Sequence, residues 1–232
     1  MVTCSARSVT LSGDPPVEIV LRHTPRARRI TLRVSRLDGQ VTLTMPPHAS
    51  EAEALWFAQA RSTWIRTQVA RAAPVQAVEP GAVLPVDGRS RRVVEADRSG
   101  VEADRIRVRT GRPSGPQVAA ILKELARDRL RAVCAMHAAR LDRRMGRITL
   151  RDTRSRWGSC SSAGDLMFSW RLILAPAPVL DYVAAHEAAH LRHMDHSLAF
   201  WATVAELMPG YTAHRSWLRR EGASLHGWRF GD

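Results

Sequence analysis

Residues 186–196 read HEAAHLRHMDH, and this stretch decides how the rest of the chain is interpreted. It opens with His186-Glu187-Ala188-Ala189-His190, and His196 follows six residues after the second histidine. In an α-helix, residues four apart lie one turn apart on the same face, so His186 and His190 can direct two imidazole nitrogens at one metal ion. The spacing therefore predicts a helix that carries two ligands of a metal site.

The glutamate in this stretch adds a chemical role to the metal site. Zinc lowers the pKa of its bound water to about 7, and a neighbouring carboxylate can take a proton from that water as it attacks a carbonyl group. Glu187 follows the first histidine directly and so lies beside such an ion. The pattern predicts a hydrolase that uses one zinc ion, with Glu187 as the general base.

A catalytic zinc usually has three protein ligands, and His196 is the leading candidate for the third. At about 100° per residue, an unbroken helix would turn His196 roughly 240° away from the second histidine, so the helix must end near His193. Asp195 and Ser197 are both good N-cap residues for a new helix, which leaves a turn for His196. Two alternative ligands remain: His193 in a tighter turn, and Glu206 on the next helix.

The composition is that of a folded protein. The chain has 232 residues, of which 45% are hydrophobic, and it has no apolar run of membrane-spanning length. Its N-terminus lacks the order of charged and apolar residues that is typical of a signal peptide. Cys4, Cys134 and Cys160 are odd in number and widely spaced, which favours reduced thiols over a disulfide framework. We therefore expect a cytoplasmic protein that is not bound to a membrane.

The chain is strongly basic, with a formal net charge of +13. Clustered cations can neutralise phosphates, so a DNA- or RNA-binding surface is one interpretation. However, the cations are 34 arginines and a single lysine, and they are scattered apart from short clusters at 26–29, 89–92 and 105–109. A solvated basic face is the alternative interpretation.

The hydrophobic patterns predict an α+β fold. Strand-like alternation runs from residue 17 to residue 45 and includes a hairpin turn at Asp38-Gly39, whereas residues 50–72 and 116–144 have helical spacing. Ser50 and Glu53 have the spacing of a capping box. Two strands, 148–152 and 166–173, are predicted to form a hairpin that flanks the helix of the metal site. We expect an N-terminal sheet-rich part with one helix, residues 1–114, and a C-terminal zincin-like metallopeptidase domain, residues 115–232.

Several motifs together resemble a known family, the YgjP-like metal-dependent hydrolases, which are related to the SprT-like and WLM zinc peptidases. The motifs are the segment Arg28–Val34, the run Arg156-Trp157-Gly158-Ser159-Cys160, the HExxH motif, His196-Ser197-x-x-Phe200-Trp201, and Met208-Pro209-Gly210-Tyr211. The resemblance covers most of the chain and is strongest from residue 151 to residue 211. It implies that His186, His190 and His196 hold the zinc, that Glu187 is the general base, and that the substrate is a polypeptide.

Other residues have less specific assignments. The segment Trp157-Gly158-Ser159 is predicted either to hold an extended peptide by strand addition or to have a purely structural use, with Trp157 packing and Gly158 permitting a bulge. Arg156, Tyr211 and His214 are candidates for stabilising the oxyanion, because each can donate a hydrogen bond to developing negative charge.

The functional hypothesis is thus a zinc-dependent peptidase. Two alternatives remain, a nucleic-acid-binding protein with a structural zinc and a zinc hydrolase that acts on non-peptide amides. A structural zinc would need a fourth protein ligand, whereas a catalytic zinc leaves that position open.

Overall fold

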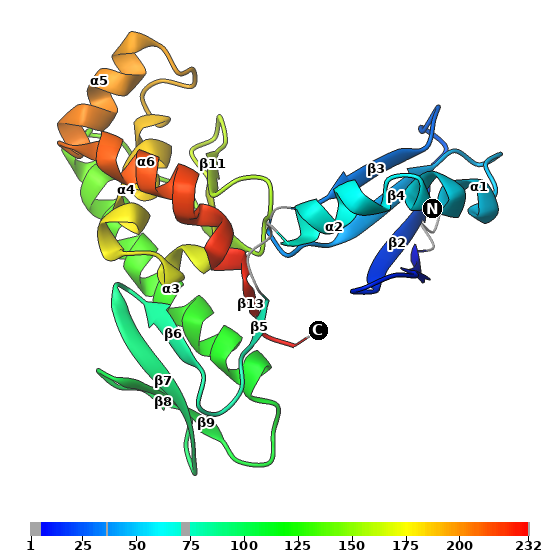
Figure 1. Ribbon diagram of the computed structural model, residues 1–232. Helices are drawn as coiled ribbons and strands as arrows, with labels where there is room; N and C mark the ends of the chain where they lie inside the picture. The colour runs from blue at the N-terminus through cyan, green and yellow to red at the C-terminus, as the bar shows by residue number, and fades with distance from the viewer. Residues whose placement is uncertain (1–5, 36, 71–74, 232) are drawn as a thin grey trace. The chain divides into compact units, whose positions relative to one another are not determined.

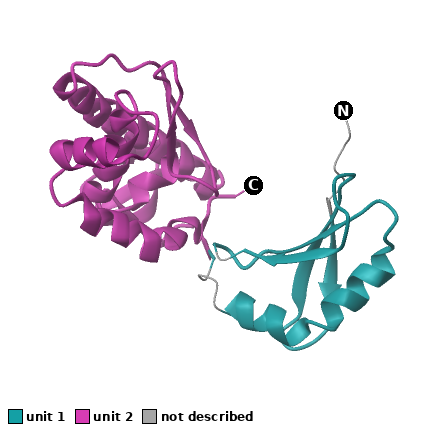
Figure 2. Ribbon diagram, turned by 90° about the horizontal axis from the view of Figure 1, so that it is seen from above, with its two compact units in different colours: residues 1–75 teal, residues 76–232 magenta. Residues whose placement is uncertain are grey.

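The computed structural model describes residues 6–35, 37–70 and 75–231 (Figure 1). Helices and several small sheets confirm the predicted α+β class. Contacts divide the chain into two compact units, residues 1–75 and 76–232 (Figure 2). This division does not test the domain boundary that the sequence predicts after residue 114, and that boundary stays a prediction. Within the described residues, every helix is too short or too polar to cross a membrane.

The first unit contains a four-stranded sheet in the order β1-β2-β4-β3. Strands β2 and β4 are parallel, and the other neighbours are antiparallel. Alternate residues of the central strands point into a small core, for example Ile19 and Leu43, which are both fully buried. The predicted turn at Asp38-Gly39 is confirmed, since it joins β3 to β4 as an antiparallel pair. The strands are β1 (Ala6–Leu11), β2 (Val17–His23), β3 (Thr31–Val34) and β4 (Val41–Met45).

The single helix predicted for residues 50–72 is wrong, because two helices occupy this segment. Helix α1 (Glu51–Gln59) begins with the predicted capping box, in which the side chains of Ser50 and Glu53 accept from each other's backbone N–H groups. The backbone N–H of Arg61 donates to the carbonyl of Ala58, which closes a tight turn before α2 (Ser62–Ala70). The hydrophobic spacing continues across this turn, so the pattern alone does not reveal the break.

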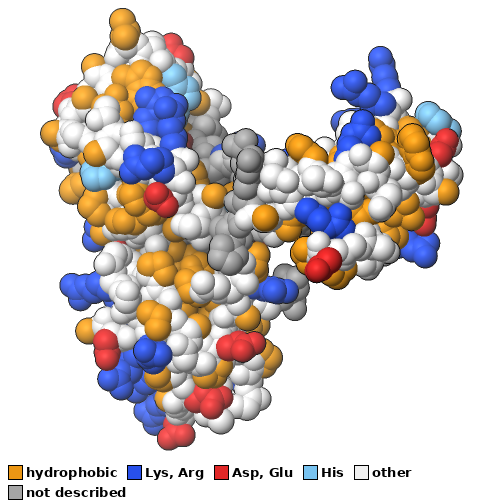
Figure 3. Space-filling model, in the orientation of Figure 1, with side chains coloured by type: hydrophobic (Ala, Val, Ile, Leu, Met, Phe, Trp, Pro, Cys, Tyr) orange, Lys and Arg blue, Asp and Glu red, His pale blue; other side chains and the backbone are white. Residues whose placement is uncertain are grey.

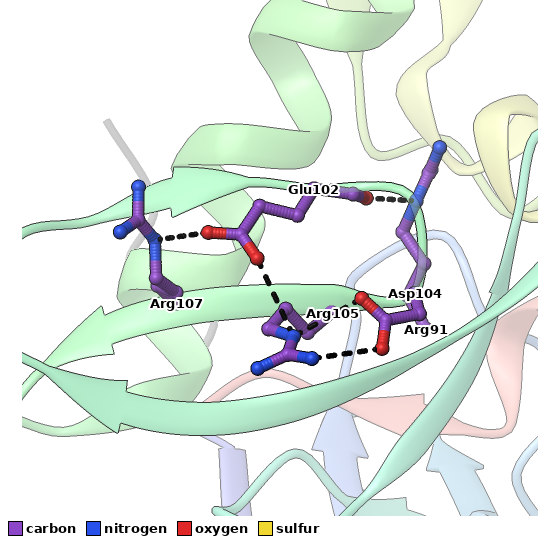
Figure 4. A network of polar contacts seen from close by, with 5 residues as sticks. All are labelled: Arg91, Glu102, Asp104, Arg105 and Arg107. Atoms are coloured by element: carbon purple, nitrogen blue, oxygen red, sulfur yellow. Dashed lines mark hydrogen bonds and ion pairs between the residues drawn. The ribbon is translucent and has the colours of Figure 1, made fainter.

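The second unit begins with a sheet in the order β6-β7-β9-β8, which packs on the long helix α3 (Ser114–Arg140). Apolar residues of the sheet, such as Val93 and Ile106, are fully buried in the core that includes α3. Arginines also lie along β9, and several of them have acidic partners. Arg105 and Arg107 pair with Glu102, and Arg105 also pairs with Asp104 (Figure 4). The strands are β6 (Val83–Val86), β7 (Arg89–Ala96), β8 (Gly100–Val101) and β9 (Arg105–Arg109).

A three-stranded sheet in the order β10-β12-β11 follows α3 and flanks the helix that carries the HExxH motif. The predicted pairing is wrong in one respect, since β10 and β12 are parallel. The antiparallel partner of β12 is β11, which lies within the segment that joins the two predicted strands. The chain after β10 therefore crosses to the other side of β12 before it turns back. The strands are β10 (Ile148–Arg151), β11 (Gly158–Cys160) and β12 (Leu166–Ser169).

The remaining elements complete the second unit around α3. Helix α4 (Ala177–Ala189) packs along α3, and its apolar residues extend the core. The other elements are β5 (Gln76–Ala77), η1 (Trp170–Leu174), α5 (Leu198–Leu207), α6 (Tyr211–Glu221), η2 (Gly222–His226) and β13 (Trp228–Arg229).

A buried histidine on α3 is expected to make the stability of the fold depend on pH. His137 is 3% exposed, and neither of its ring nitrogens has a hydrogen-bond partner among the described residues. Burial, reinforced by the charge of Arg140, lowers the pKa of His137 from 6.5 to about 4. The unfolded chain therefore takes up a proton at a pH where the folded chain does not.

The contribution of the neutral His137 to the free energy of unfolding is complete above pH 6.5 and is lost as the pH falls from 6.5 towards 4. Between about pH 7.5 and about pH 5, we expect the free energy of unfolding to drop by about 2 kcal/mol through this residue. Urea unfolding at both pH values should show that His137→Leu loses this part of the pH dependence. The variant His48→Leu, which removes an exposed histidine, is the control and should keep it.

Candidate metal centre

Helix α4 positions the first two histidines. Its core-facing residues bury it against α3, and Pro178 suits its first turn because a proline there loses no helical hydrogen bond. His186 and His190 lie one turn apart at the C-terminal end of the helix, with ring centroids 5.2 Å apart. The helix ends at Ala189, and His190 is its C-cap. This end, before His193, agrees with the predicted helix break.

The next turn brings the third histidine back to the first two. Ser197 is the N-cap of α5, and its side chain accepts from the backbone N–H of Phe200. Asp195 accepts from the backbone N–H of Ser197, so both predicted capping residues shape the turn that contains His196. Phe200 packs against the rings of all three histidines, with centroid distances of 4.5 to 4.9 Å. Its ring fixes the spacing of the three imidazoles.

The three histidines form a group that fits a metal ion. One ring nitrogen from each of His186, His190 and His196 lies within 4.8 Å of the others. The Nε2 atoms of His186 and His196 are 3.2 Å apart, and nitrogens bound to a tetrahedral zinc with Zn–N distances of about 2.0 to 2.1 Å lie about 3.3 Å apart. Two lone pairs at this distance repel unless a proton or a cation lies between them.

The alternative ligands do not join this group in the described structure. His193 contributes its backbone carbonyl, which lies 2.9 Å from Nδ1 of His190. Glu206 lies 3.8 Å from Arg192, in an ion pair. The fold therefore brings together the three histidines that the sequence spacing favours as ligands.

His186 and His190 have the protonation states that metal ligands need. A carbonyl oxygen only accepts, so Nδ1 of His190 carries the proton and Nε2 keeps its lone pair. Burial, and then the nearby His190, His196 and Arg215, lower the pKa of His186 to about 4. Neutral imidazoles at neutral pH are the form that binds a cation.

Glu187 is held beside this group by a close backbone approach. Its side chain is buried, and burial raises the pKa of Glu187 to about 8. Gly158 on β11 faces it so closely that a Cβ atom there would lie 2.5 Å from Oε1 of Glu187 and 2.6 Å from Cγ. Gly158 therefore leaves the space that the carboxylate occupies, and a bound divalent cation would favour the ionised form of that carboxylate.

The sequence pattern of the YgjP-like family, described as a metallopeptidase domain, matches residues 28–221. The chain belongs to the YgjP-like metallopeptidase family. Members of this family are metal-dependent peptidases, which confirms the resemblance drawn from the motifs. The crystal structure of the metallopeptidase zymogen of Pyrococcus abyssi abylysin is similar over 40% of this chain and 92% of that chain. The identity is 20% and the TM-score is 0.36, and we draw no conclusion about this chain from so low a score. No curated protein matches the chain.

In this YgjP-like chain, a cavity opens onto the three histidines and Glu187. Strand β11 forms one wall, through Gly158, Ser159 and Cys160, and Met194 contributes from the turn after α4. In its sheet, β11 is an edge strand that pairs only with β12 among the described strands. Burial, and then the charges of Glu187 and Asp165, raise the pKa of Cys160 to about 11, which disfavours this thiol as a nucleophile.

The candidate oxyanion donors of the YgjP-like chain lie in different surroundings. Arg156 is exposed, and its backbone carbonyl accepts from the Thr153 hydroxyl. Trp157 lines a second cavity that reaches Glu187, and its ring lies 5.2 Å from that of His226. His214 lies near Asp181; burial raises the pKa of that carboxyl, while Arg129 and, to a smaller extent, His214 oppose the shift.

Tyr211 belongs to a stack of aromatic rings next to the ligands. Its ring stacks on Trp201 at 5.5 Å and on Tyr182 at 6.1 Å. Arg215 lies 4.4 Å over the ring of Trp201, which is itself 5.6 Å from His186. Arg215 and Tyr182 are not predicted from the sequence, and only their helical spacing from Tyr211 and His186 could have pointed to them.

Proposed function

We propose that the chain is a zinc metalloendopeptidase in which His186, His190 and His196 hold one zinc ion and Glu187 is the general base. The observation that carries this proposal is the convergence of three imidazoles beside a buried carboxylate. Bound zinc would supply an activated water and polarise the carbonyl group of the substrate. Three protein ligands leave a position open for that water, which favours a catalytic over a structural ion.

Glu187 is proposed to accept the proton of the attacking water and to deliver it to the leaving amine. Its buried position keeps it next to the ion, and Gly158 fixes the face from which it reaches the cavity. Burial alone raises the pKa of this carboxyl to about 8, and a bound cation would lower that pKa, so that the ionised Glu187 could accept a proton and release it again near neutral pH.

The substrate is proposed to be an extended polypeptide that lies along β11. The free edge of this strand offers backbone N–H and C=O groups, and its residues line the same cavity as the histidines. Arg156, Ser159, Tyr211 and His214 stay proposed contacts to the substrate or the oxyanion. The free thiols of Cys134 and Cys160 suit a reducing compartment such as the cytoplasm, which is part of the proposal.

Removal of the metal tests this proposal directly. The purified protein should contain one zinc per chain and should cleave unfolded polypeptides, and dialysis against a chelator should abolish both properties. Zinc, added back, should restore cleavage. Retained cleavage in metal-free protein would contradict the proposal, and cleavage of small amides without cleavage of peptides would favour the non-peptide hydrolase.

A further inference from the structure

Apart from the cavities beside the candidate metal centre, a groove lies in the first unit. The residues that line it have no part in the proposed mechanism. It encloses about 680 Å³, within the range of sites that bind ligands. Trp56 on α1 borders this groove and is 75% exposed, although a large apolar ring is usually shielded from water. The groove is lined by Arg28, Arg29, Ile30, Pro46, His48, Ala49, Ala52, Glu53, Trp56 and Phe57.

The charge around this groove is positive and unbalanced. Residues 1–75 contain ten arginines and five acidic residues. Within the described residues, five exposed arginines of this unit have no ion pair or hydrogen bond through their side chains: Arg22, Arg26, Arg28, Arg29 and Arg33. Figure 3 shows arginine side chains along the upper edge of the smaller unit, next to apolar side chains.

These unpaired arginines contrast with the sheet of the second unit. There, Arg105 and Arg107 lie against Glu102, and their charges are partly neutralised (Figure 4). The one acidic residue of the groove, Glu53, is engaged by the backbone N–H of Ser50 at 2.8 Å in the capping box. The groove thus presents arginines that lack a carboxylate partner, which favours an acidic ligand.

The inner surface of the groove indicates what kind of acidic ligand fits. Most of the uncharged lining residues are apolar, such as Ile30, Pro46 and Phe57, and apolar side chains offer no hydrogen bonds to the polar edges of nucleic-acid bases. They can bury apolar side chains, while Arg28 and Arg29 reach carboxylates at the rim. An apolar and acidic polypeptide satisfies both features.

We propose that this groove binds an acidic polypeptide segment with apolar side chains, as a docking site for the substrate away from the scissile bond. The substrate role rests on the proposed peptidase function. Because both units belong to one chain, a segment held in the groove raises the concentration of the same polypeptide near the metal centre.

Binding is tested with full-length protein in a Glu187→Gln background, so that the ligand is not cleaved. The probe is a short fluorescent peptide that alternates leucine with glutamate. We expect Trp56→Ala to weaken binding by about tenfold or more, as for an aromatic anchor at an interface. Trp64→Ala is the matched control, since Trp64 is 47% exposed in the same unit but lies outside the groove, and it should bind as before. Arg28→Ala should reduce the salt dependence of binding.

The outcomes separate this inference from the proposed function. Equal losses in Trp56→Ala and Trp64→Ala, or tighter binding of single-stranded RNA or of anionic vesicles than of the peptide, would overturn the docking site. If wild-type protein cleaves peptides but the groove variants bind the probe normally, only this inference fails. If the probe binds in the groove but wild-type protein cleaves nothing, only the peptidase proposal and the substrate role that rests on it fail. With an intact metal centre, Trp56→Ala should raise KM for long acidic substrates and leave short neutral peptides unaffected.

Discussion

Glu187→Gln is expected to slow peptide hydrolysis by about 10²- to 10⁴-fold, the contribution that a positioned general base typically makes. Glutamine has nearly the same shape, so it fills the space opposite Gly158 in the same way. Its amide group cannot accept the proton of the attacking water. The three histidines remain in place, and we therefore expect the variant to bind zinc as wild-type protein does.

The measurement is kcat on an unfolded polypeptide, together with the zinc content of each preparation. Glu206→Gln is the matched control, because Glu206 is an exposed glutamate on α5, the helix that follows His196, and pairs with Arg192. It should keep wild-type activity. Full activity of metal-replete Glu187→Gln would rule out this residue as the base.

Gly158→Ala is expected to lower kcat by about 10²-fold, since a shift of about 1 Å in a reacting group has an effect of this size. The added Cβ would lie 2.5 Å from Oε1 of Glu187. Glu187 is 5% exposed, so its side chain has little room to move aside. Either β11 or the carboxylate must shift, and the base then no longer faces the site of attack.

This effect should appear without loss of metal or of folding, because the three atoms nearest to the added methyl group all belong to Glu187 and none to a histidine. Zinc content and thermal unfolding are the accompanying measurements. Gly100→Ala is the control: Gly100 also lies on a strand of the second unit, but its Cβ would meet only the end of the Arg107 side chain. A Gly158→Ala enzyme with normal kcat would show that the close contact does not position Glu187.

The residues of the metal centre could be predicted because they are local in sequence. Helical spacing relates His186 to His190, and the rotation per residue requires a helix end before His196. The cap at Ser197 follows from the chemistry of its hydroxyl, which satisfies a free backbone N–H at a helix start. Each of these features depends on fewer than a dozen residues that are neighbours in the sequence, so long-range packing does not alter it.

Long-range pairing could not be predicted in the same way. The parallel pairing of β10 with β12 depends on which edge the intervening chain takes, and alternation of apolar residues is the same for either choice. The turn between α1 and α2 is hidden because apolar spacing continues through it. The place of Arg215 on α6 above Trp201 on α5 depends on how both helices pack against α4, which is a matter of tertiary contacts.

The contact between Gly158 and Glu187 makes β11 a spacer within the proposed active site. Gly158 of this three-residue strand packs on the carboxylate, and the three residues line the wall of the cavity. In the proposed mode of binding, a peptide that adds to the edge of β11 would be placed at a fixed distance from Glu187, whatever its side chains are. Alignment of the scissile bond would then depend on backbone register, so that the enzyme could cut many sequences at a constant geometry.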